Sequence, residues 1–360
     1  MKVDVIIIGQ GISGTFLSWE LQKAGLSFCV IDNQDPAGSS RAAAGIINPI
    51  TGRRMVQTWM IDTLLENCQQ AYGQLSEELQ VNLFRELSII DFFPTPQMRL
   101  SFIDRFNEGN KFLSFEPDGD DFIDHFNYDF GYGEIKPCYL VDTRSLLSAW
   151  RVQLQKTSAL IEEDFNIAQL ETRNSHVFYK QLEADRIVFC DGIGSATNPY
   201  FKHLPFAPNK GEALLIEANE IPANHIFKKG MNVVPAGDQL FWVGSTYEWS
   251  FKDSFPTSVF RERTIHFLKS FLKSEFNVIE QFAALRPATL ERRPFVGFHP
   301  SNPAIGILNG MGTKGCSLAP YFARELAQMI SKGTPVLAEA SIERFHKVLL
   351  RSNGNAGLIN

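Results

Sequence analysis

Three glycines near the N-terminus have the spacing of a phosphate-binding turn. Gly9, Gly11 and Gly14 follow the apolar run Val3–Ile8 and precede Thr15–Ala24, whose apolar residues recur at helical spacing. In such a turn the first glycine permits a tight bend and the second lets the backbone approach a pyrophosphate. The third lets the helix pack closely on the strand. The pattern therefore predicts a turn that can bind a dinucleotide.

An acidic residue completes this unit. Phe28–Ile31 predicts a second buried strand, and it ends at Asp32, whose carboxylate can accept hydrogen bonds from a ribose. The glycine spacing alone also occurs in ordinary turns. Strand, glycine turn, helix, strand and acid in this order predict a dinucleotide-binding βαβ unit.

A second glycine loop lies near the C-terminus. Gly310, Gly312 and Gly315 follow a predicted strand, Ala304–Leu308, and precede a predicted helix, Ser317–Ile330. No second acid-ended unit follows, so this helix end is expected to face the far end of the same ligand. A reduced isoalloxazine carries negative charge that a helix N-terminus stabilises, which favours FAD over NAD. An ordinary connection between strand and helix is the alternative.

The remaining pattern predicts a fold of the α/β class. We expect a Rossmann-like FAD-binding domain with an interleaved, mostly antiparallel β-sheet substrate domain (α+β). The expected FAD-binding domain comprises 1–80, 140–200 and 285–360, and the substrate domain comprises 81–139 and 201–284. Further helices are predicted over 54–76, 143–156 and 260–273, and further strands over 164–170, 186–190 and within 213–244.

Composition narrows the possible partners. The 360 residues include 34 Lys and Arg against 40 Asp and Glu, a net charge of −6. That balance disfavours nucleic-acid binding through bulk electrostatics, and no apolar run is long enough to span a membrane. The five cysteines are scattered, which indicates a reduced, cytoplasmic protein without a zinc site. We expect Cys316 to be a packed thiol. The acids Asp118, Asp120, Asp121 and Asp124 lack calcium-loop spacing, so no metal is expected.

These motifs together resemble the FAD-dependent D-amino-acid oxidase superfamily, particularly its glycine oxidase and sarcosine oxidase-like members. Two segments are also similar to the oxidoreductase domain of the bifunctional tRNA carboxymethylaminomethyl-uridine modification enzymes, namely 244–248 and 310–320. The resemblance comprises five blocks that occur in the same order. The first is the N-terminal βαβ unit with Gly9, Gly11 and Gly14. The others are 38–45, 184–192, 241–248, and 285–289, which continues through Pro294 and Gly297 to 310–320.

The resemblance implies which residues hold FAD. The backbone of Ile12 and Ser13 would face the pyrophosphate, Asp32 and Asn33 would contact the adenosine ribose, and Ile167 would hold the adenine through its backbone. The pyrophosphate and flavin edge would be lined by Ser40, Arg41, Ala44, Gly45 and Ile46. Met311 through Ser317 would wrap the flavin pyrimidine end, and the loop residues counted as cofactor-binding are Gly310, Met311, Gly312, Thr313, Lys314 and Gly315, with Gly192 ending a neighbouring strand. Relatives with covalent flavin have His or Cys where this chain has Ala42 and Leu285 or Arg286, so non-covalent FAD is expected.

The resemblance also implies the chemistry. Arg286 would clamp a substrate carboxylate with its planar guanidinium, and Tyr247 would face the substrate. The expected reaction oxidises the C–N bond of a small amine or amino acid of glycine or N-substituted glycine type. Hydride transfer to flavin N5 would be followed by imine hydrolysis. Trp242 stands where some relatives have a lysine that assists reaction with oxygen, so the electron acceptor, oxygen or a carrier, stays open.

Three other functions remain possible from the sequence. The same pocket chemistry could act on the carboxymethylaminomethyl group of a tRNA wobble uridine, although a net charge of −6 argues mildly against RNA. An NAD(P)-dependent dehydrogenase would be colourless when purified. A flavin-binding scaffold without turnover would have no reaction to lose when Arg286 is replaced.

Overall fold

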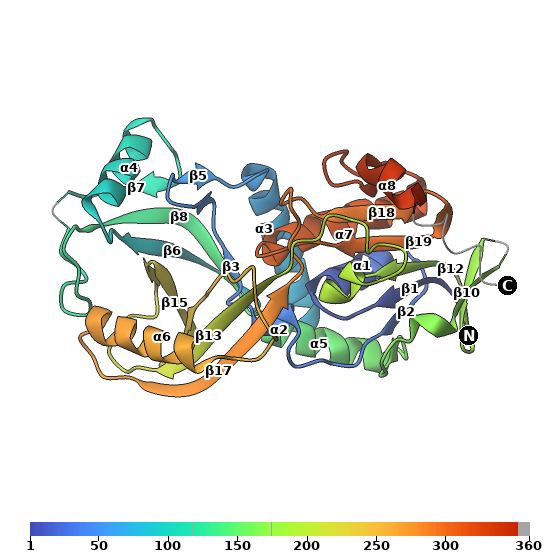
Figure 1. Ribbon diagram of the computed structural model, residues 1–360, viewed down its shortest axis with the longest axis horizontal. Helices are drawn as coiled ribbons and strands as arrows, with labels where there is room; N and C mark the ends of the chain where they lie inside the picture. The colour runs from blue at the N-terminus through green and yellow to red at the C-terminus, as the bar shows by residue number, and fades with distance from the viewer. Residues whose placement is uncertain (118, 174, 352–360) are drawn as a thin grey trace.

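The computed structural model describes residues 1–117, 119–173 and 175–351. Within these ranges the chain forms two large β-sheets that lie in neighbouring lobes (Figure 1). Helices α1, α5 and α7 belong to one lobe, while α4 and α6 belong to the other. Asp118 and residues 352–360, which fall within segments considered above, lie outside the described residues.

The first sheet is built around β1, which lies at its centre between β2 and β12. Both neighbours run parallel to it. Val5 through Ile7 are fully buried, as expected of a strand covered on both faces. In the described chain this sheet has eight strands, which are β1 (Lys2–Ile8), β2 (Phe28–Ile31), β9 (Leu160–Ile161), β10 (Leu170–Arg173), β11 (His176–Tyr179), β12 (Leu182–Phe189), β18 (Phe295–His299) and β19 (Asn302–Asn309).

β12 pairs with β1 along one side and with two different strands along its other side. Its first residues pair with β11 in an antiparallel hairpin, and its last residues, Ile187–Phe189, pair in parallel with β19. The carboxyl ends of β1, β12 and β19 therefore meet at one edge of the sheet. Such an edge is where open α/β sheets bind their ligands.

The second sheet is antiparallel except where β14 runs parallel to β6. Its order is β17-β13-β16-β15-β14-β6-β8-β3, with β7 beside β8. The described strands are β3 (Ile46–Ile47), β6 (Phe84–Phe92), β7 (Leu113–Ser114), β8 (Tyr132–Val141), β13 (Asn209–Glu217), β14 (Ile226–Lys229), β15 (Met231–Gly237), β16 (Leu240–Gly244) and β17 (Asn277–Arg286). A small hairpin pairs β4 (Ile50–Thr51) with β5 (Val56–Gln57).

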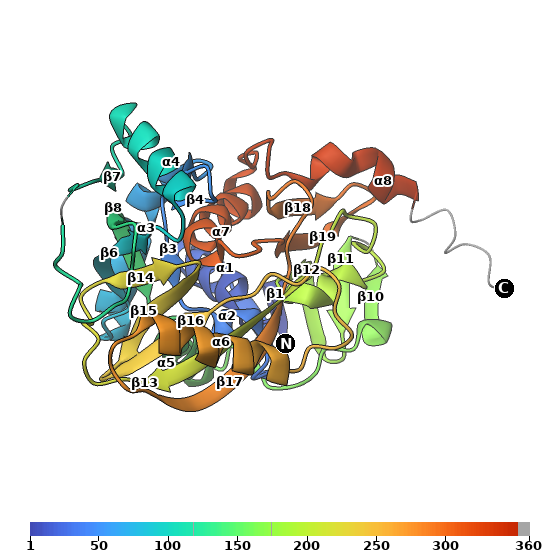
Figure 2. The same cartoon turned by 60° about the vertical axis from the view of Figure 1, so that its left-hand side comes forward.

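Helices cover the faces of both sheets. Figure 2 shows α6 along the outer face of the second sheet, where Phe260 and Leu268 of α6 pack with Leu214 of β13. The described helices are α1 (Ile12–Lys23), α2 (Ser39–Ala42), α3 (Ile61–Leu79), α4 (Pro96–Asn107), α5 (Thr143–Lys156), α6 (Ser258–Phe271), α7 (Gly315–Lys332) and α8 (His346–Arg351), with 3₁₀ turns at Ile167–Gln169, Gly192–Ala196 and Ile342–Phe345.

The structure confirms the predicted fold class and corrects two elements. A strand predicted over 164–170 is wrong, because the Asn166 side chain accepts a hydrogen bond from the Ala168 amide and caps a 3₁₀ turn there. The helix predicted over 54–76 begins only at Ile61, since Val56 and Gln57 form a strand. The helix predicted over 143–156 has those bounds, with the Asp142 side chain capping its N-terminus.

Candidate active site

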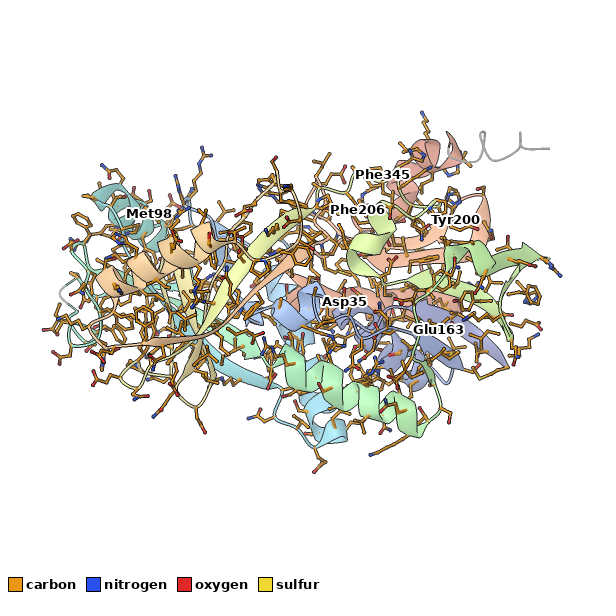
Figure 3. The ribbon with its side chains drawn as sticks, turned by 60° about the horizontal axis from the view of Figure 1, so that its bottom comes forward. Asp35, Met98, Glu163, Tyr200, Phe206 and Phe345 are labelled. Carbon is orange, nitrogen blue, oxygen red and sulfur yellow. The ribbon has the colours of Figure 1, made fainter. Side chains whose placement is uncertain are left out.

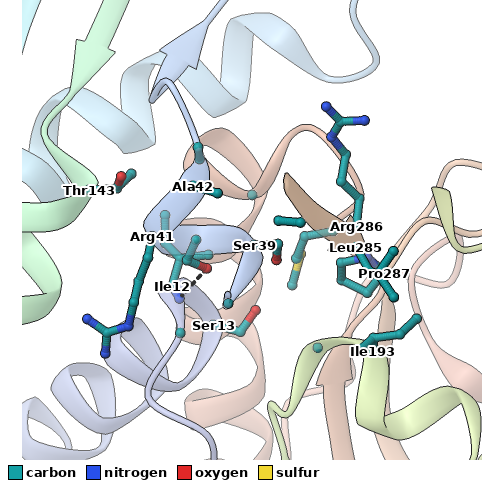
Figure 4. A pocket seen from close by; sticks show the side chains of 18 of the residues that line it. Ile12, Ser13, Ser39, Arg41, Ala42, Thr143, Ile193, Leu285, Arg286 and Pro287 are labelled. Carbon is teal, nitrogen blue, oxygen red and sulfur yellow. Dashed lines mark hydrogen bonds between the residues drawn. The ribbon is translucent and has the colours of Figure 1, made fainter. Parts of the chain in front are cut away.

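A cavity of about 700 Å³ lies where the two sheets meet (Figure 4). Its walls include the glycine turn before α1, the segment around α2, the ends of β12 and β19, and the start of α7. Strands β13 and β17 of the second sheet close it. The volume is typical of a site for a cofactor or small molecule.

The first glycine turn is shaped by close backbone contacts. A Cβ atom built on Gly14 would lie 1.9 Å from the carbonyl oxygen of Gly9, so only glycine lets α1 approach the turn. Gly9 itself has φ +94°, and a Cβ there would lie 2.8 Å from the Cys190 carbonyl oxygen. Both positions therefore require glycine for packing, independently of any ligand.

The N-terminus of α1 faces the cavity. The Ile12 amide donates a 3.1 Å hydrogen bond to Ser40 Oγ, drawn as a dashed line in Figure 4. A Cβ on Gly11 would lie 3.2 Å from the same oxygen. The turn and the segment around α2 thus form one wall in which backbone amides and a hydroxyl lie close together. This donor set suits a pyrophosphate.

Asp32 is held in place by an arginine that the sequence analysis did not identify. Arg151 Nη1 lies 2.7 Å from Asp32 Oδ1, and its Nη2 lies 2.9 Å from Glu162 Oε2. The Gln10 amide donates to Asp32 Oδ2 at 2.8 Å. Arg151 is 4% exposed, and its hydrogen bond lowers the pKa of Glu162. The carboxylate predicted to bind ribose is therefore fixed before any ligand binds.

Acidic and aromatic side chains surround the expected adenosine end of the cavity. Asn33 Nδ2 donates to Asp164 Oδ1 at 2.6 Å. Glu163 and Phe165 also line the cavity, and Figure 3 shows Glu163 on the lobe of the first sheet. Ile167 is not among the lining residues, because its 3₁₀ turn directs it onto the hydrophobic core of that lobe.

Lys314 lies at the opposite end, at the N-cap of α7. Its Nζ donates a 2.8 Å hydrogen bond to Thr58 Oγ1. Burial, with a smaller contribution from Arg292, lowers the pKa of Lys314 to about 8. The neighbouring Cys316 is buried, as expected of a packed thiol, and burial raises the pKa of this thiol to about 12. A Cβ on Gly310 would lie 2.7 Å from Thr289 Cγ2, so this glycine serves packing.

Arg286 closes the cavity from the second sheet. Its Nη1 donates to Asn209 Oδ1 at 2.7 Å and to the Thr246 carbonyl oxygen at 3.0 Å. Its Nη2 donates to Ser245 Oγ at 2.6 Å. The guanidinium carbon lies 4.7 Å from the Tyr247 ring centroid. Burial lowers the pKa of Arg286, but an arginine stays charged at any physiological pH.

The structure brings most of the predicted site residues to this one cavity. Those that line it are Gly9, Gly11, Ile12, Ser13, Asp32, Asn33, Ser40, Arg41, Ala44, Gly45, Ile46, Gly192, Tyr247, Arg286, Met311, Gly312, Thr313, Lys314 and Gly315. Gly14, Gly310 and Ile167 do not line it. Figure 4 shows the guanidinium groups of Arg41 and Arg286 extending away from Ser13. Trp242 also lines the cavity, and its Nε1 donates to the Ala42 carbonyl at 3.1 Å.

The lining residues fit FAD. The N-terminus of α1 would bind the pyrophosphate. The N-terminus of α7 lies in the same cavity, together with the Lys314 amine, whose hydrogen-bond partner Thr58 is uncharged. Among the described residues, no group of three or more His, Cys, Asp or Glu side chains could hold a metal ion. In the same part of the chain, we find no helix long and apolar enough to cross a membrane.

Comparison with known proteins supports the assignment of an FAD site. A family model described as FAD dependent oxidoreductase (DAO) matches residues 4–329. A glycine oxidase of Bacillus licheniformis is 25% identical over 94% of this chain and 95% of its own length. The crystal structure of glycine oxidase from Geobacillus kaustophilus superposes with a TM-score of 0.76 at 17% identity, covering 93% of this chain and 96% of that chain.

A second solved structure shares the fold. Iminodiacetate oxidase from a Chelativorans species has a TM-score of 0.72 at 20% identity, covering 95% of this chain and 98% of that chain. The family match spans both glycine loops, the segment around α2 and the strand that carries Arg286. The chain belongs to the D-amino-acid oxidase superfamily of FAD-dependent oxidoreductases.

Proposed function

We propose that this enzyme oxidises the C–N bond of a small amine or amino acid that bears a carboxylate, of glycine or N-substituted glycine type. The observation that supports the proposal most directly is the environment of Arg286. This arginine lines the cavity, and its three hydrogen-bond partners, Asn209, Ser245 and Thr246, are all uncharged. Among the described residues this cation forms no ion pair with an acid, so it is suited to a carboxylate ligand.

The chain's own residues would orient the substrate. Arg286 would bind the carboxylate and fix the neighbouring C–H bond relative to the flavin. Tyr247, which is 59% exposed, packs its ring against the guanidinium group. The flavin would supply the redox chemistry by accepting a hydride equivalent. The oxidised product is an imine, and water hydrolyses it to a carbonyl compound and an amine.

We also propose how the chain divides its work. The segments 1–80, 140–200 and 285–360 would hold FAD without a covalent bond, and 81–139 with 201–284 would hold the substrate. Three pieces of the first set reach into the second sheet, namely β3, the last two residues of β8 and the last two residues of β17. Arg286 would thus link the two regions.

The relatives support the small-molecule substrate. Glycine oxidases and the iminodiacetate oxidase are named for glycine and for a glycine with a second carboxymethyl group on nitrogen. The alternative substrate, a carboxymethylaminomethyl uridine in tRNA, gains no support from them. The electron acceptor, oxygen or a carrier, is left to experiment.

The test is the visible absorption spectrum of the purified holoenzyme during anaerobic titration. Glycine, sarcosine and iminodiacetate should bleach the flavin band, and methylamine and dimethylamine, which lack the carboxylate, should not. Equal bleaching by both sets would contradict the role of Arg286. A flavin band that none of these compounds bleaches, but that a carboxymethylaminomethyl nucleoside does, would move the assignment to the alternative. Re-oxidation in air then tests oxygen as acceptor.

A further inference from the structure

Arg286 depends on a segment that wraps around the end of its sheet. Residues 245–257, which we call the strap, connect β16 to α6. The strap starts on the cavity side, where Ser245 and Thr246 accept hydrogen bonds from Arg286. It ends at Thr257, which caps the N-terminus of α6 on the outer face. The position of the guanidinium group therefore depends on where the strap lies.

One residue of β13 holds both ends of the strap. The Glu212 amide donates a 2.9 Å hydrogen bond to Thr246 Oγ1 at the first end. At the second end, the Glu212 carboxylate accepts from the Thr257 amide at 2.6 Å and from Thr257 Oγ1 at 2.9 Å. Gln281 Nε2 lies 3.2 Å from the same carboxylate. The Glu212 residue is 0% exposed, so these bonds form in a low-dielectric environment.

A buried lysine supports this carboxylate. Lys210 Nζ lies 3.5 Å from Glu212 Oε1 and 4.0 Å from Asp253 in the strap. Lys210 also exchanges two 2.9 Å backbone hydrogen bonds with Glu248, next to Tyr247. Lys210 and Glu212 thus contact the strap at Thr246, Glu248, Asp253 and Thr257.

The register of the sheet links the strap anchor to the arginine. Asn209 pairs with Arg286 across β13 and β17, and Gly211 pairs with Ala284. A Cβ on Gly211 would lie 1.9 Å from Arg286 Nη2, so the guanidinium lies directly on the backbone between Lys210 and Glu212. Side chains alternate along a strand. The Glu212 residue is among those that line the cavity, but by this alternation its carboxylate lies on the strand face opposite Arg286, where it accepts hydrogen bonds from Thr257 and Gln281.

We propose that Glu212 is a positioning residue that sets the carboxylate affinity of Arg286 by anchoring both ends of the strap. The substrate part of this inference rests on the proposed function, and the anchoring part does not. A buried glutamate that only stabilises the fold would affect FAD binding, substrate affinity and the rate of flavin reduction together. A positioning role affects substrate affinity alone.

The test uses the Glu212→Gln holoenzyme in anaerobic stopped-flow reduction by the best carboxylate substrate. A glutamine amide cannot accept all the bonds that the carboxylate accepts, so the Thr257 end of the strap should loosen, while the backbone amide of residue 212 still donates to Thr246 Oγ1. We expect the apparent Kd for substrate to rise about tenfold or more, with the limiting reduction rate and the FAD affinity within about twofold of wild type. Glu217→Gln, at the far end of the same strand, is the matched control. Thr246→Val, which removes only the front anchor, should raise Kd if Glu212→Gln does not fold.

Hydrogen exchange provides a readout that needs no substrate. Strap peptides that contain Tyr247, Trp249 and Phe255 should exchange faster in Glu212→Gln, while peptides of β1 and α1 should not change. Unchanged strap exchange, or an unchanged substrate Kd with a folded variant, would overturn the proposal. Faster exchange throughout the chain with loss of FAD would also overturn it, in favour of a structural role. If no carboxylate amine reduces the wild type, yet strap exchange still rises, the proposed function fails and the anchor stands.

Discussion

The guanidinium carbon of Arg286 lies 4.7 Å from the ring centroid of Tyr247. The ring is the outermost of the groups around this cation, because Tyr247 is 59% exposed while Asn209 is buried. A substrate carboxylate would thus meet an arginine held by three uncharged acceptors and covered by one aromatic ring. Each of these contacts can be removed separately.

Replacing Arg286 with lysine should weaken substrate binding. Lysine keeps the charge but loses the planar fork that binds a carboxylate through two hydrogen bonds. A lost charged hydrogen bond costs about 1.5–3 kcal/mol, which corresponds to a rise of roughly 10- to 150-fold in KM. Steady-state kinetics with a carboxylate amine measures the effect. Arg263→Lys, an exposed position on α6, is the control. An unchanged KM would exclude Arg286 as the carboxylate ligand.

Replacing Tyr247 with alanine should have a smaller effect. The ring contributes a cation–π contact of about 0.5–2 kcal/mol, so KM should rise by roughly 2- to 30-fold. Tyr247→Phe keeps the ring and should behave nearly as wild type in the same assay. If the phenylalanine variant instead loses activity as fully as the alanine variant, the hydroxyl rather than the ring is important.

Arg151 should matter for both stability and cofactor retention. Arg151→Met removes the cation that Asp32 and Glu162 share, and leaves the mostly buried Asp32 without a counter-charge. Breaking such a pair costs about 3 kcal/mol or more. Chemical denaturation should report that loss, and fluorescence titration should show weaker FAD binding. Lys156→Met, exposed at the end of the same helix, should change neither property. Wild-type FAD affinity in Arg151→Met would show that Asp32 needs no positioning.

Two glycine-to-alanine changes should act in opposite directions. In Gly14→Ala the new methyl group would lie 1.9 Å from the Gly9 carbonyl oxygen, so the first turn of α1 must move. We expect lower stability and loss of FAD. In Gly73→Ala, within α3, the new Cβ meets no atom within 4 Å apart from its chain neighbours and the backbone of its own helix. Alanine there should stabilise the protein by up to about 1 kcal/mol. Melting temperatures of both variants provide the comparison.

Lys314 should give the apoprotein a distinct dependence on pH. Its pKa is about 8 in the folded protein and about 10.4 in an unfolded chain. Between these values the unfolded chain binds more protons, so the free energy of unfolding should rise with pH. Below pH 8 both states are protonated and the contribution is constant. The slope between pH 8 and 10 should be shallower in Lys314→Met than in wild type. Lys332→Met, exposed at the other end of α7, should keep the wild-type slope.

Local sequence patterns made the two glycine loops and the acid after β2 predictable. The turn before α1, the acid after β2 and the loop before α7 each lie within about 30 consecutive residues, and strand and glycine signals mark them in the sequence. The helix over 143–156 was predictable because Asp142 caps it and its apolar residues repeat at helical spacing. Where a polar side chain overrode the apolar pattern, as Asn166 does, the strand prediction was wrong.

The contacts that depend on pairing between distant strands and helices could not be predicted from the sequence. Asn209 and Arg286 are separated by 77 positions in the chain, and only the pairing of β13 with β17 brings them together. Arg151 was missed for the same reason, since Asp32 lies 119 positions away. Asn209 and Arg151 do not belong to any motif recognised in the sequence. The one signal in the sequence was that Arg151 lies on the apolar face of the helix predicted over 143–156. Such a pattern indicates that the arginine is buried, but it does not indicate which acidic residue it pairs with.

The pairing of β12 with both β1 and β19 affects when the protein can fold during synthesis. β1 and β2 lie close together in the sequence, but β12 and β19 complete the same edge of that sheet from the second half of the chain. On a ribosome, an emerging chain holds the first glycine turn long before α7 exists. The binding cavity can therefore close only when synthesis has passed residue 317. Because the pairings of β1 with β12 and of β12 with β19 join strands more than 100 residues apart, they should form slowly, and cofactor binding should follow them.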